Sequence, residues 1–394
     1  MTSEWRTIRA ADFIDFNPRL SLKKGDIATK VAMDKLKPFT KKIPETEKAE
    51  FNGGAKFCNG DTVMARITPC LENGKTAYVD MLDDGEIGFG STEFIVMRAK
   101  TGISDPQFVY YTAINPVFCN VAIKSMVGSS GRQRVQQSVL EELELSVPDL
   151  DEQRRIGDFL ARIDEKIALN DRINDNLEQQ AQSYFQELFV DNANPEWTTG
   201  TISDLGAVVG GSTPSKAKPE YYTESGIAWI TPKDLSINKS KFVSHGENDI
   251  TELGLKNSSA AIMPEGTVLF SSRAPIGYIA IAAGEVTTNQ GFKSVVPKPE
   301  IGTPFVYFFL KNTLPVIEGM ASGSTFKEVS GSTMKNVPAV IPDAETLAKF
   351  SDFCAPIFAQ QRILEEQNQS LATLRDNLLP KLMSGEIDVS AVQL

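Results

Sequence analysis

Histidine and cysteine are scarce in this chain of 394 residues, which contains one histidine and four cysteines. Cys58, Cys70, Cys119 and Cys354 lie far apart and form no Cys-x-x-Cys pair. Zinc sites are built from these two residue types, and disulfide frameworks need closely spaced cysteines. We therefore expect no metal site, and we expect reduced, mostly buried thiols in a cytoplasmic protein. The one histidine, His245, lies in a polar string, and we expect it to be exposed.

Long apolar runs are also absent. No stretch approaches the roughly 18–20 uninterrupted apolar residues that a membrane-spanning helix needs. The first ten residues are polar, contain Glu4, and lack the apolar centre of a signal peptide. With 41% hydrophobic and 23% charged residues, the composition is typical of a globular protein.

The sequence contains none of the common catalytic motifs that we searched for. It has no Gly-x-x-x-x-Gly-Lys-Ser/Thr loop, no Gly-x-Ser-x-Gly elbow and no Cys/His dyad. The strings beginning Asn17-Pro18 and Asn115-Pro116 lack the second proline of an amino-methyltransferase loop, so we interpret both as turns. The sequence therefore predicts a protein without catalytic residues, and it argues against a fused methyltransferase.

The formal net charge is −11, and acidic residues outnumber basic ones most clearly in 151–195. Proteins that bind nucleic acid through phosphates need basic patches at the contact surface. The charge therefore counts against a free-standing, non-specific nucleic-acid binder. A negative net charge is compatible with local basic patches in the rest of the chain.

Several strings occur twice at a nearly constant offset, which indicates an internal duplication. Asp61-Thr62-Val63-Met64 is echoed by Gly266-Thr267-Val268-Leu269, and each copy is followed by a turn with arginine and proline. The other repeated pairs are Glu4-Trp5 and Glu196-Trp197, 107–111 and 304–308, 128–130 and 323–325, and Val147-Pro148 and Ile341-Pro342.

Each half begins with a region of about 145 residues that mixes short strands, turns and short helices, as an α+β module does. We expect strands at 75–79, 93–97, 267–271 and 278–282, and short helices at 108–112 and 305–310.

Each half ends in a long helix with heptad spacing, which is typical of a coiled-coil seam. The predicted seam residues are Ile156, Leu160, Ile163, Ile167, Asn174, Leu177, Ile357, Leu364, Asn368, Leu371 and Leu378. About 40 residues would form a rod of roughly 60 Å. Asn174 and Asn368 are polar seam residues that could set the register, although a bundle with a polar cavity would also explain them. We expect Pro356 to kink the second helix or to start it afresh.

These patterns predict an α+β fold of two pseudo-twofold-related modules separated by two long antiparallel coiled-coil helices. The predicted boundaries are 1–147 for module 1, 148–192 for the central helix, 193–341 for module 2 and 342–394 for the C-terminal helix and tail. This arrangement suits a protein that reads two separated half-sites on one DNA duplex.

The chain resembles type I restriction–modification specificity subunits over nearly its whole length. The strings that carry the resemblance are Ala65–Lys75 with 90–94, Val147–Ile156, 211–214, Trp229–Leu235, 271–273, 289–292 and 379–387. One departure concerns the start of the second helix, Asp343–Leu347, which lacks the Glu-Gln-x-x-Ile string of the first. If that string docks a partner, the two docking sites are unequal.

The resemblance implies a non-catalytic subunit with two target-recognition domains, each reading half of a split double-stranded DNA site. The implied partners are two adenine-N6 methyltransferase subunits and motor-nuclease subunits. S-adenosylmethionine, ATP and Mg would belong to those partners, and this chain would hold no cofactor.

Bases are read by bidentate side chains in the major groove, and phosphates are bound by cations, hydroxyls and amides. The predicted DNA-binding residues are Arg66, Lys75, Arg132, Gln133, Arg134, Lys216, Lys218, Lys233, Ser272, Arg273 and Lys327. Each could instead be an ordinary surface residue, and Arg66 could pair with a carboxylate of its own module. An alternative function from another class is a coiled-coil scaffold with two protein- or sugar-binding modules.

Overall fold

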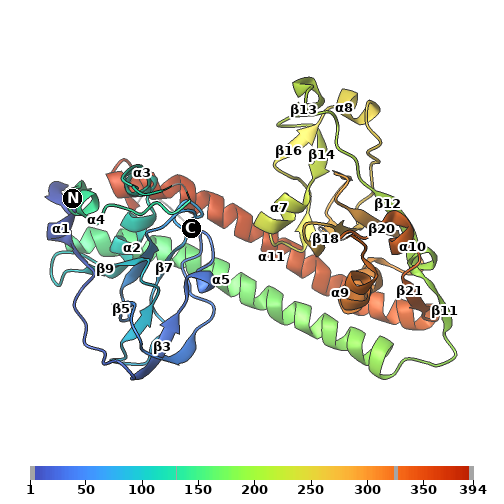
Figure 1. The fold of residues 1–394 in the computed structure, drawn as a ribbon, viewed down its shortest axis with the longest axis horizontal. Coiled ribbons are helices and arrows are strands. Elements are labelled where there is room, and N and C mark those ends of the chain that lie inside the picture. The colour runs from blue at the N-terminus through green and yellow to red at the C-terminus, as the bar shows by residue number, and fades with distance from the viewer. Residues whose placement is uncertain (1–4, 130, 324–326, 390–394) are drawn as a thin grey trace. The chain divides into compact units, whose positions relative to one another are not determined.

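The computed structural model describes residues 5–129, 131–323 and 327–389, which form two compact units. Unit 1 comprises Met1–Leu169 and Gln367–Leu394, and unit 2 comprises Asn170–Glu366. Each unit contains one α+β module and part of each long helix, α5 (Leu150–Gln186) and α11 (Ala344–Ser384) (Figure 1). The limits of the units fall inside these helices, so the predicted module boundaries are not tested by this division and stay a prediction.

Unit 1 contains two four-stranded sheets and a separate strand pair within its described residues. Its strands are β1 (Arg6–Arg9), β2 (Ile14–Phe16), β3 (Ile27–Val31), β4 (Glu47–Glu50), β5 (Ala55–Phe57), β6 (Thr62–Ala65), β7 (Thr76–Tyr78), β8 (Gly88–Gly90), β9 (Phe94–Ala99) and β10 (Glu144–Val147). The sheet orders are β2-β9-β6-β7 and β4-β3-β8-β5, and β1 pairs with β10. Strands β7 and β9 confirm the two predicted runs of this module within one or two residues.

Module 1 has four short helices and one 3-10 turn within its described residues. They are α1 (Ala10–Phe13), the 3-10 turn η1 (Met33–Lys35), α2 (Pro106–Ile114), α3 (Pro116–Lys124) and α4 (Gln137–Glu141). Asp105 caps α2 by accepting from the Phe108 N–H, and α2 then packs on β6, β7 and β9 (Figure 1). Asn115 caps α3 in the same way, so the string Asn115-Pro116 starts a helix.

Unit 2 has the same plan. Its strands are β11 (Thr198–Thr201), β12 (Gly206–Gly210), β13 (Tyr222–Thr223), β14 (Ile227–Ile230), β15 (Phe242–Val243), β16 (Asn248–Ile250), β17 (Val268–Ser272), β18 (Ile276–Ala282), β19 (Thr287–Thr288), β20 (Lys293–Pro297) and β21 (Pro338–Ile341). The sheet orders are β12-β20-β17-β18-β15 and β13-β16-β14-β19, and β11 pairs with β21. The predicted runs at 267–271 and 278–282 are confirmed as β17 and β18.

The helices of unit 2 differ in one respect from the prediction. They are the π-helical turn η2 (Glu187–Asp191), α6 (Ile202–Leu205), the 3-10 turn η3 (Pro219–Tyr221), α7 (Pro232–Ile237), α8 (Glu252–Lys256), α9 (Thr303–Met320) and α10 (Gly331–Lys335). The short helix predicted at 305–310 is part of α9, which is 18 residues long and continues through Pro315. Its first half is buried in the module core, and that packing outweighs the hydrogen bond that Pro315 cannot donate.

Backbone hydrogen bonds correct the predicted alignment of the two halves. The N–H of Val79 donates to Asp61, and in the second half the N–H of Ala282 donates to Thr267. Asp61 therefore corresponds to Thr267 and not to Gly266, so the sequence alignment was one residue out of register. The two possible alignments match strand residues of similar character, so the sequence does not distinguish them. The hydrogen-bond pattern does.

The two long helices have the predicted length, with 37 residues in α5 and 41 in α11. In unit 1 Asp164 near the start of α5 bonds to Arg375 near the end of α11, and in unit 2 Glu178 bonds to Gln361. The helices therefore run antiparallel, as predicted.

The apolar stripe of each helix is buried against its module as well as against the other helix. The seam residues Ile156, Leu160, Ile163, Ile357 and Leu364 are buried, and Ile167, Asn174, Leu177, Asn368, Leu371 and Leu378 are half-buried. Ile156 and Leu160 belong to the hydrophobic core of module 1, and Ile357 to that of module 2. The heptad residues thus form the faces on which the helices pack against the modules, as well as the seam between the two helices.

Two expectations about the helices have different outcomes. Helix α11 continues through Pro356, so the expectation that the helix starts afresh there is wrong. Pro356 and Asp352 are both exposed, and water can bond the carbonyl that the proline leaves without a donor. The carbonyl of Asn174 accepts from Gln361 at 3.2 Å, while its Oδ1 is buried without a partner among the described residues. Its role in setting the register stays a prediction.

A buried lysine joins each module to α5. In unit 1 Lys41 Nζ donates to Gln107 at 2.5 Å and lies 3.2 Å from the hydroxyl of Tyr111, which donates to Asp164 at 2.5 Å. Burial lowers the pKa of Lys41 to about 8. These contacts fix the sheet edge of module 1 against the first part of α5.

The corresponding lysine in unit 2 is Lys241. Its Nζ donates to Glu178 at 2.8 Å and to Gln361 at 2.9 Å, and it lies 3.4 Å from the ring centre of Phe358. Burial lowers the pKa of Lys241 to about 8. Burial alone would raise the pKa of Glu178, but Lys241 and Lys311 lower it to about 2. The carboxylate of Glu365 on α11 accepts from the N–H of Lys241, so module 2 is anchored to both helices through charged groups.

The thiols differ from expectation. Cys354 is buried, but Cys58, Cys70 and Cys119 are only half-buried, so the prediction of mostly buried thiols is wrong. All four are free. Among the helices of the described residues, none combines the length and apolar character that a membrane crossing requires.

Candidate nucleic-acid interface

Module 1 contains a basic groove with a volume of about 580 Å³. Its lining includes three cationic residues, Arg19, Lys56 and Arg66, and no acidic residue. Lys56 Nζ donates to the carbonyl of Leu20 at 3.0 Å, which holds it at the groove wall. The remaining lining residues are Asn17, Pro18, Leu20, Gly54, Ala55, Thr92, Phe94 and Val96. Such a groove is suited to an anionic backbone.

Arg66 was predicted from sequence, and the structure places it in this groove. Its Nη2 donates to the carbonyl of Val135 at 3.4 Å. Its Nε is buried and has no partner among the described residues. No carboxylate of the described chain lies within ion-pair distance of Arg66, so the alternative of an internal ion pair is not observed. A buried donor without an acceptor costs free energy, which a bound acceptor would recover.

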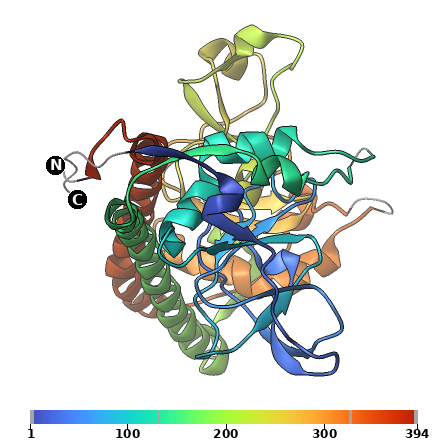
Figure 2. The same ribbon diagram turned by 90° about the vertical axis from the view of Figure 1, so that its left-hand side faces the viewer.

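Arg134 lies beside the groove on the hairpin segment that follows α3, drawn in teal and green in Figure 2, and its backbone bridges Val127 and Ile67, the neighbour of Arg66. Its guanidinium faces Glu93 side-on, with Nε at 2.9 and 3.0 Å from the two carboxylate oxygens and Nη2 at 2.6 Å from Oε1. These hydrogen bonds lower the pKa of Glu93, so the carboxylate is charged at neutral pH. Sequence reasoning predicted Arg134 and missed Glu93, because the search was for cations.

The other predicted residues of module 1 have different surroundings. Arg132 is exposed on the hairpin, and the backbone carbonyl of Gln133 accepts from Thr68. Lys75 is half-buried, and its Nζ donates to the carbonyl of Met33 at 3.0 Å. Lys75 therefore supports its own module, and it would have to give up this bond to reach DNA.

In module 2 the structure brings together loops that the sequence had singled out separately. The Ser212 N–H donates to Thr288, and the indole of Trp229 donates to the Ser212 carbonyl. Thr213 bonds the side chain of Gln290. The N–H of Ser272 donates to the carbonyl of Gly291. The strings at 211–214, 229–235, 271–273 and 289–292 thus form one loop cluster.

Two predicted residues lie at the base of this cluster. Ser272 is fully buried, and its hydroxyl donates to Gly291 at 3.1 Å, so we leave its side chain out of the proposed interface. Arg273 is partly exposed and lies 3.5 Å from Glu328, which is also 3.9 Å from Lys293. The predicted lysines Lys216, Lys218, Lys233 and Lys327 are exposed, and Lys233 pairs with Glu247.

The two modules are not equivalent at the base of the cluster. The N–H of Val135 donates to the carbonyl of Arg66, and the N–H of Val329 donates to that of Ser272. Arg66 therefore corresponds to Ser272, and Arg273 has no arginine counterpart in module 1. An arginine–glutamate pair occurs at this place in both modules. In module 1 the arginine is Arg134 on the hairpin, and in module 2 it is Arg273 directly after β17.

Sequence reasoning missed Arg19, Lys56 and Lys293. Arg19 and Lys56 lie far apart along the chain, and nothing in the sequence shows that they meet Arg66 at one groove. Lys293 follows the predicted loop 289–292 directly, so its position was a usable signal. His245 is exposed, as predicted, with Nδ1 3.4 Å from Asp249.

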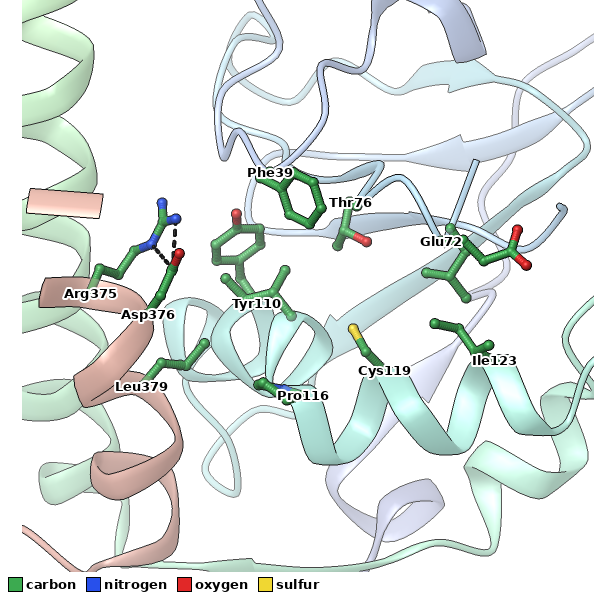
Figure 3. Close-up of a pocket in the computed structure, with 13 residues that line it drawn as sticks. Phe39, Glu72, Thr76, Tyr110, Pro116, Cys119, Ile123, Arg375, Asp376 and Leu379 are labelled. Atoms are coloured by element: carbon green, nitrogen blue, oxygen red, sulfur yellow. Dashed lines mark hydrogen bonds and ion pairs between the residues drawn. The ribbon is translucent and has the colours of Figure 1, made fainter. Parts of the chain in front are cut away.

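A second hollow in unit 1 has another character. It has a volume of about 330 Å³ and is lined mainly by apolar side chains from the module and from α11. Figure 3 shows Arg375 and Asp376 on one wall and Cys119 and Ile123 on another. Arg375 and Asp376 already bond to each other, and the third charged lining residue, Glu72, is exposed to solvent, so the hollow is mainly apolar. Within the described residues, no group of three or more His, Cys, Asp or Glu side chains could hold a metal ion.

Comparison with known proteins relates both halves of the chain to one family. The sequence profile of the type I restriction modification DNA specificity domain matches twice, over residues 3–179 and 194–374. The specificity subunit of the type I restriction enzyme HindI from Haemophilus influenzae is 24% identical over 83% of this chain and 86% of its own length. That of MjaIX from Methanocaldococcus jannaschii is 39% identical, over 47% of this chain and 45% of its own length.

A solved structure shows the same fold. The type I restriction–modification S subunit from M. genitalium superposes with a TM-score of 0.58 at 18% identity, over 96% of each chain. The twofold profile match confirms the duplication that the repeated strings predicted. Because that match covers most of both halves, the chain belongs to the family of type I restriction–modification DNA specificity subunits.

Proposed function

We propose that this chain reads a split DNA site, with module 1 contacting one half-site and module 2 the other. The observation that carries this proposal is a partly exposed Arg–Glu pair at the same structural place in both modules, Arg134 with Glu93 in module 1 and Arg273 with Glu328 in module 2. The residues proposed for module 1 are Arg19, Lys56, Arg66, Arg132, Gln133 and Arg134. Those proposed for module 2 are Lys216, Lys218, Lys233, Arg273, Lys293 and Lys327. Specificity subunits of this family carry no catalysis of their own, which accords with the absence of catalytic motifs.

We further propose that α5 and α11 dock two adenine-N6 methyltransferase subunits, with motor-nuclease subunits added for restriction. The support is the long exposed surface of both helices, which includes Leu169 and Ile173 of α5 and Ile363 and Leu374 of α11. Neighbouring exposed apolar side chains are typical of interaction surfaces, and Leu169 and Ile173 are four residues apart on one face of α5. S-adenosylmethionine, ATP and Mg would then be held by the partners. The scaffold alternative loses its support, because the family of the chain is a DNA specificity family.

Binding by the methyltransferase complex to duplexes with one half-site scrambled at a time tests the division of labour. Arg273→Ala should weaken recognition of one half only, by about 10- to 100-fold, as expected for one lost base contact. Arg134→Ala should act on the other half. If both variants lose sensitivity to the same half-site, the assignment of one module to each half is wrong. Loss across all sequences, with a shallower salt dependence, would indicate phosphate contacts instead.

A further inference from the structure

Arg134 is held in place both by its backbone and by its guanidinium group. Its backbone N–H and carbonyl bond to Val127 at 2.9 and 3.0 Å across the base of the hairpin. Its guanidinium is held by Glu93 through both Nε and Nη2. Nevertheless, 45% of the Arg134 side chain and 24% of the Glu93 side chain remain exposed. The arginine is therefore fixed in place and still accessible.

The geometry leaves one edge of the guanidinium available. Glu93 occupies the edge formed by Nε and Nη2, and Nη1 donates no hydrogen bond within the described part of the chain. The remaining edge presents parallel N–H groups of Nη1 and Nη2. Guanine offers two acceptors, O6 and N7, side by side in the major groove, whereas adenine pairs its N7 with a donor. The free edge of Arg134 is therefore complementary to guanine.

The basic groove begins next to this arginine. Thr92 and Phe94, the neighbours of Glu93 in the chain, both line it together with Arg19, Lys56 and Arg66. Cations in this position would bind the phosphates of a strand whose base edge faces Arg134. Phosphate contacts of this kind set the register in which a base is read.

We propose that Arg134, positioned by Glu93, reads a guanine in the half-site of module 1. This inference rests on the proposed function and makes it specific in its chemistry. Glu93 is a positioning residue that orients the guanidinium and holds its Nε edge away from the base. An exposed ion pair contributes little to stability on its own. If the Arg134–Glu93 pair served only to hold the hairpin, removing it would change stability little and would leave base preference unchanged.

The test starts from the complex of the full chain with its methyltransferase subunits, which selects bound duplexes from a randomised library. Each guanine of the selected site is then replaced in turn by 7-deazaguanine, which lacks the N7 acceptor. The wild-type complex should lose about tenfold in affinity at one guanine. Arg134→Ala should bind the unmodified site about 10- to 100-fold more weakly and should no longer respond to that replacement.

Glu93→Gln tests the positioning role. It should keep part of the affinity but discriminate less between guanine and adenine at that one position. Arg9→Ala is the matched control, because Arg9 lies in the same unit, is 46% exposed and is paired with Asp12 and Glu142. It should behave as the wild type. Thermal unfolding of each variant checks that the fold is retained.

The outcomes separate two failures. If the wild-type complex selects no sequence, the proposed function itself fails. If it selects a site that contains no guanine, or if Arg134→Ala responds to 7-deazaguanine as the wild type does at every position, only the present inference is overturned.

Discussion

Arg375 and Asp164, 211 residues apart in the chain, form a buried ion pair in which Nη1 lies 2.6 Å from Oδ1. Their side chains are only 9% and 7% exposed. Asp164 also accepts from the hydroxyl of Tyr111, and Arg375 also bonds to Asp376. Burial alone would lower the pKa of Arg375, but the two carboxylates raise it, so this guanidinium is charged. One charged cluster thus joins α5, α11 and module 1.

Removing one partner of this pair should destabilise unit 1 strongly. We expect Arg375→Met to lower the free energy of unfolding by about 3–5 kcal/mol, because Asp164 is left as a buried charge. The control is Arg362→Met on the same helix, whose partly exposed arginine pairs with Glu265 and Glu366. That change should cost about 1 kcal/mol or less. Urea unfolding measures both, and equal effects would contradict the importance of the buried pair.

Two leucines of α5 test the docking of the helix against module 1. Leu160 is fully buried in the module core, whereas Leu169 is 42% exposed. Leu160→Ala should cost about 2–5 kcal/mol, since it leaves a cavity. Leu169→Ala should stay within about 0.5 kcal/mol of the wild type. Similar costs, measured by urea unfolding, would show that the helix packs on the module less tightly than the structure indicates.

The long helices and the duplication were predictable, because heptads and repeated strings extend over many residues. The alignment of β6 with its counterpart β17 in the second half was not predictable, because neighbouring alignments match almost equally well in residue type. Ser272 looked like a contact residue because its hydroxyl is polar, but the hydroxyl is used inside the loop cluster. Burial of this kind depends on tertiary packing, which a local string does not report.

The buried lysines and Glu93 illustrate a second limit. Lysine is mostly exposed in proteins, so nothing local marked Lys41 or Lys241 as buried. Glu93 was overlooked because a search for DNA contacts favours cations. In both cases the function of the side chain depends on a partner that is distant in sequence.

Acid should weaken the anchor of module 2. Glu178 has a folded-state pKa of about 2, below its ordinary value of 4.5, so it stabilises the fold above pH 4.5 and loses this effect as the pH falls towards 2. We expect Glu178→Gln to be less stable than the wild type at pH 7, with a difference about 2 kcal/mol smaller at pH 3. Urea unfolding at both pH values measures this. The exposed Glu252, changed to Gln, is the control, and a difference for Glu178→Gln that does not change with pH would contradict the assignment.

The charged pair of module 2 should behave differently from that of module 1. Glu328 contacts Arg273 at 3.5 Å through a single nitrogen and lies 3.9 Å from Lys293, so it partly neutralises two cations without orienting either. Glu328→Gln should therefore raise the affinity of the methyltransferase complex for DNA a few-fold at low salt and steepen its salt dependence, because the two cations become available to phosphates. Base preference should stay the same. Glu252→Gln, which removes an exposed carboxylate of the same unit, should have little effect. Weaker binding by Glu328→Gln at a single base pair would mean instead that Glu328 accepts a hydrogen bond from a cytosine amino group, the contact that a carboxylate makes in the major groove.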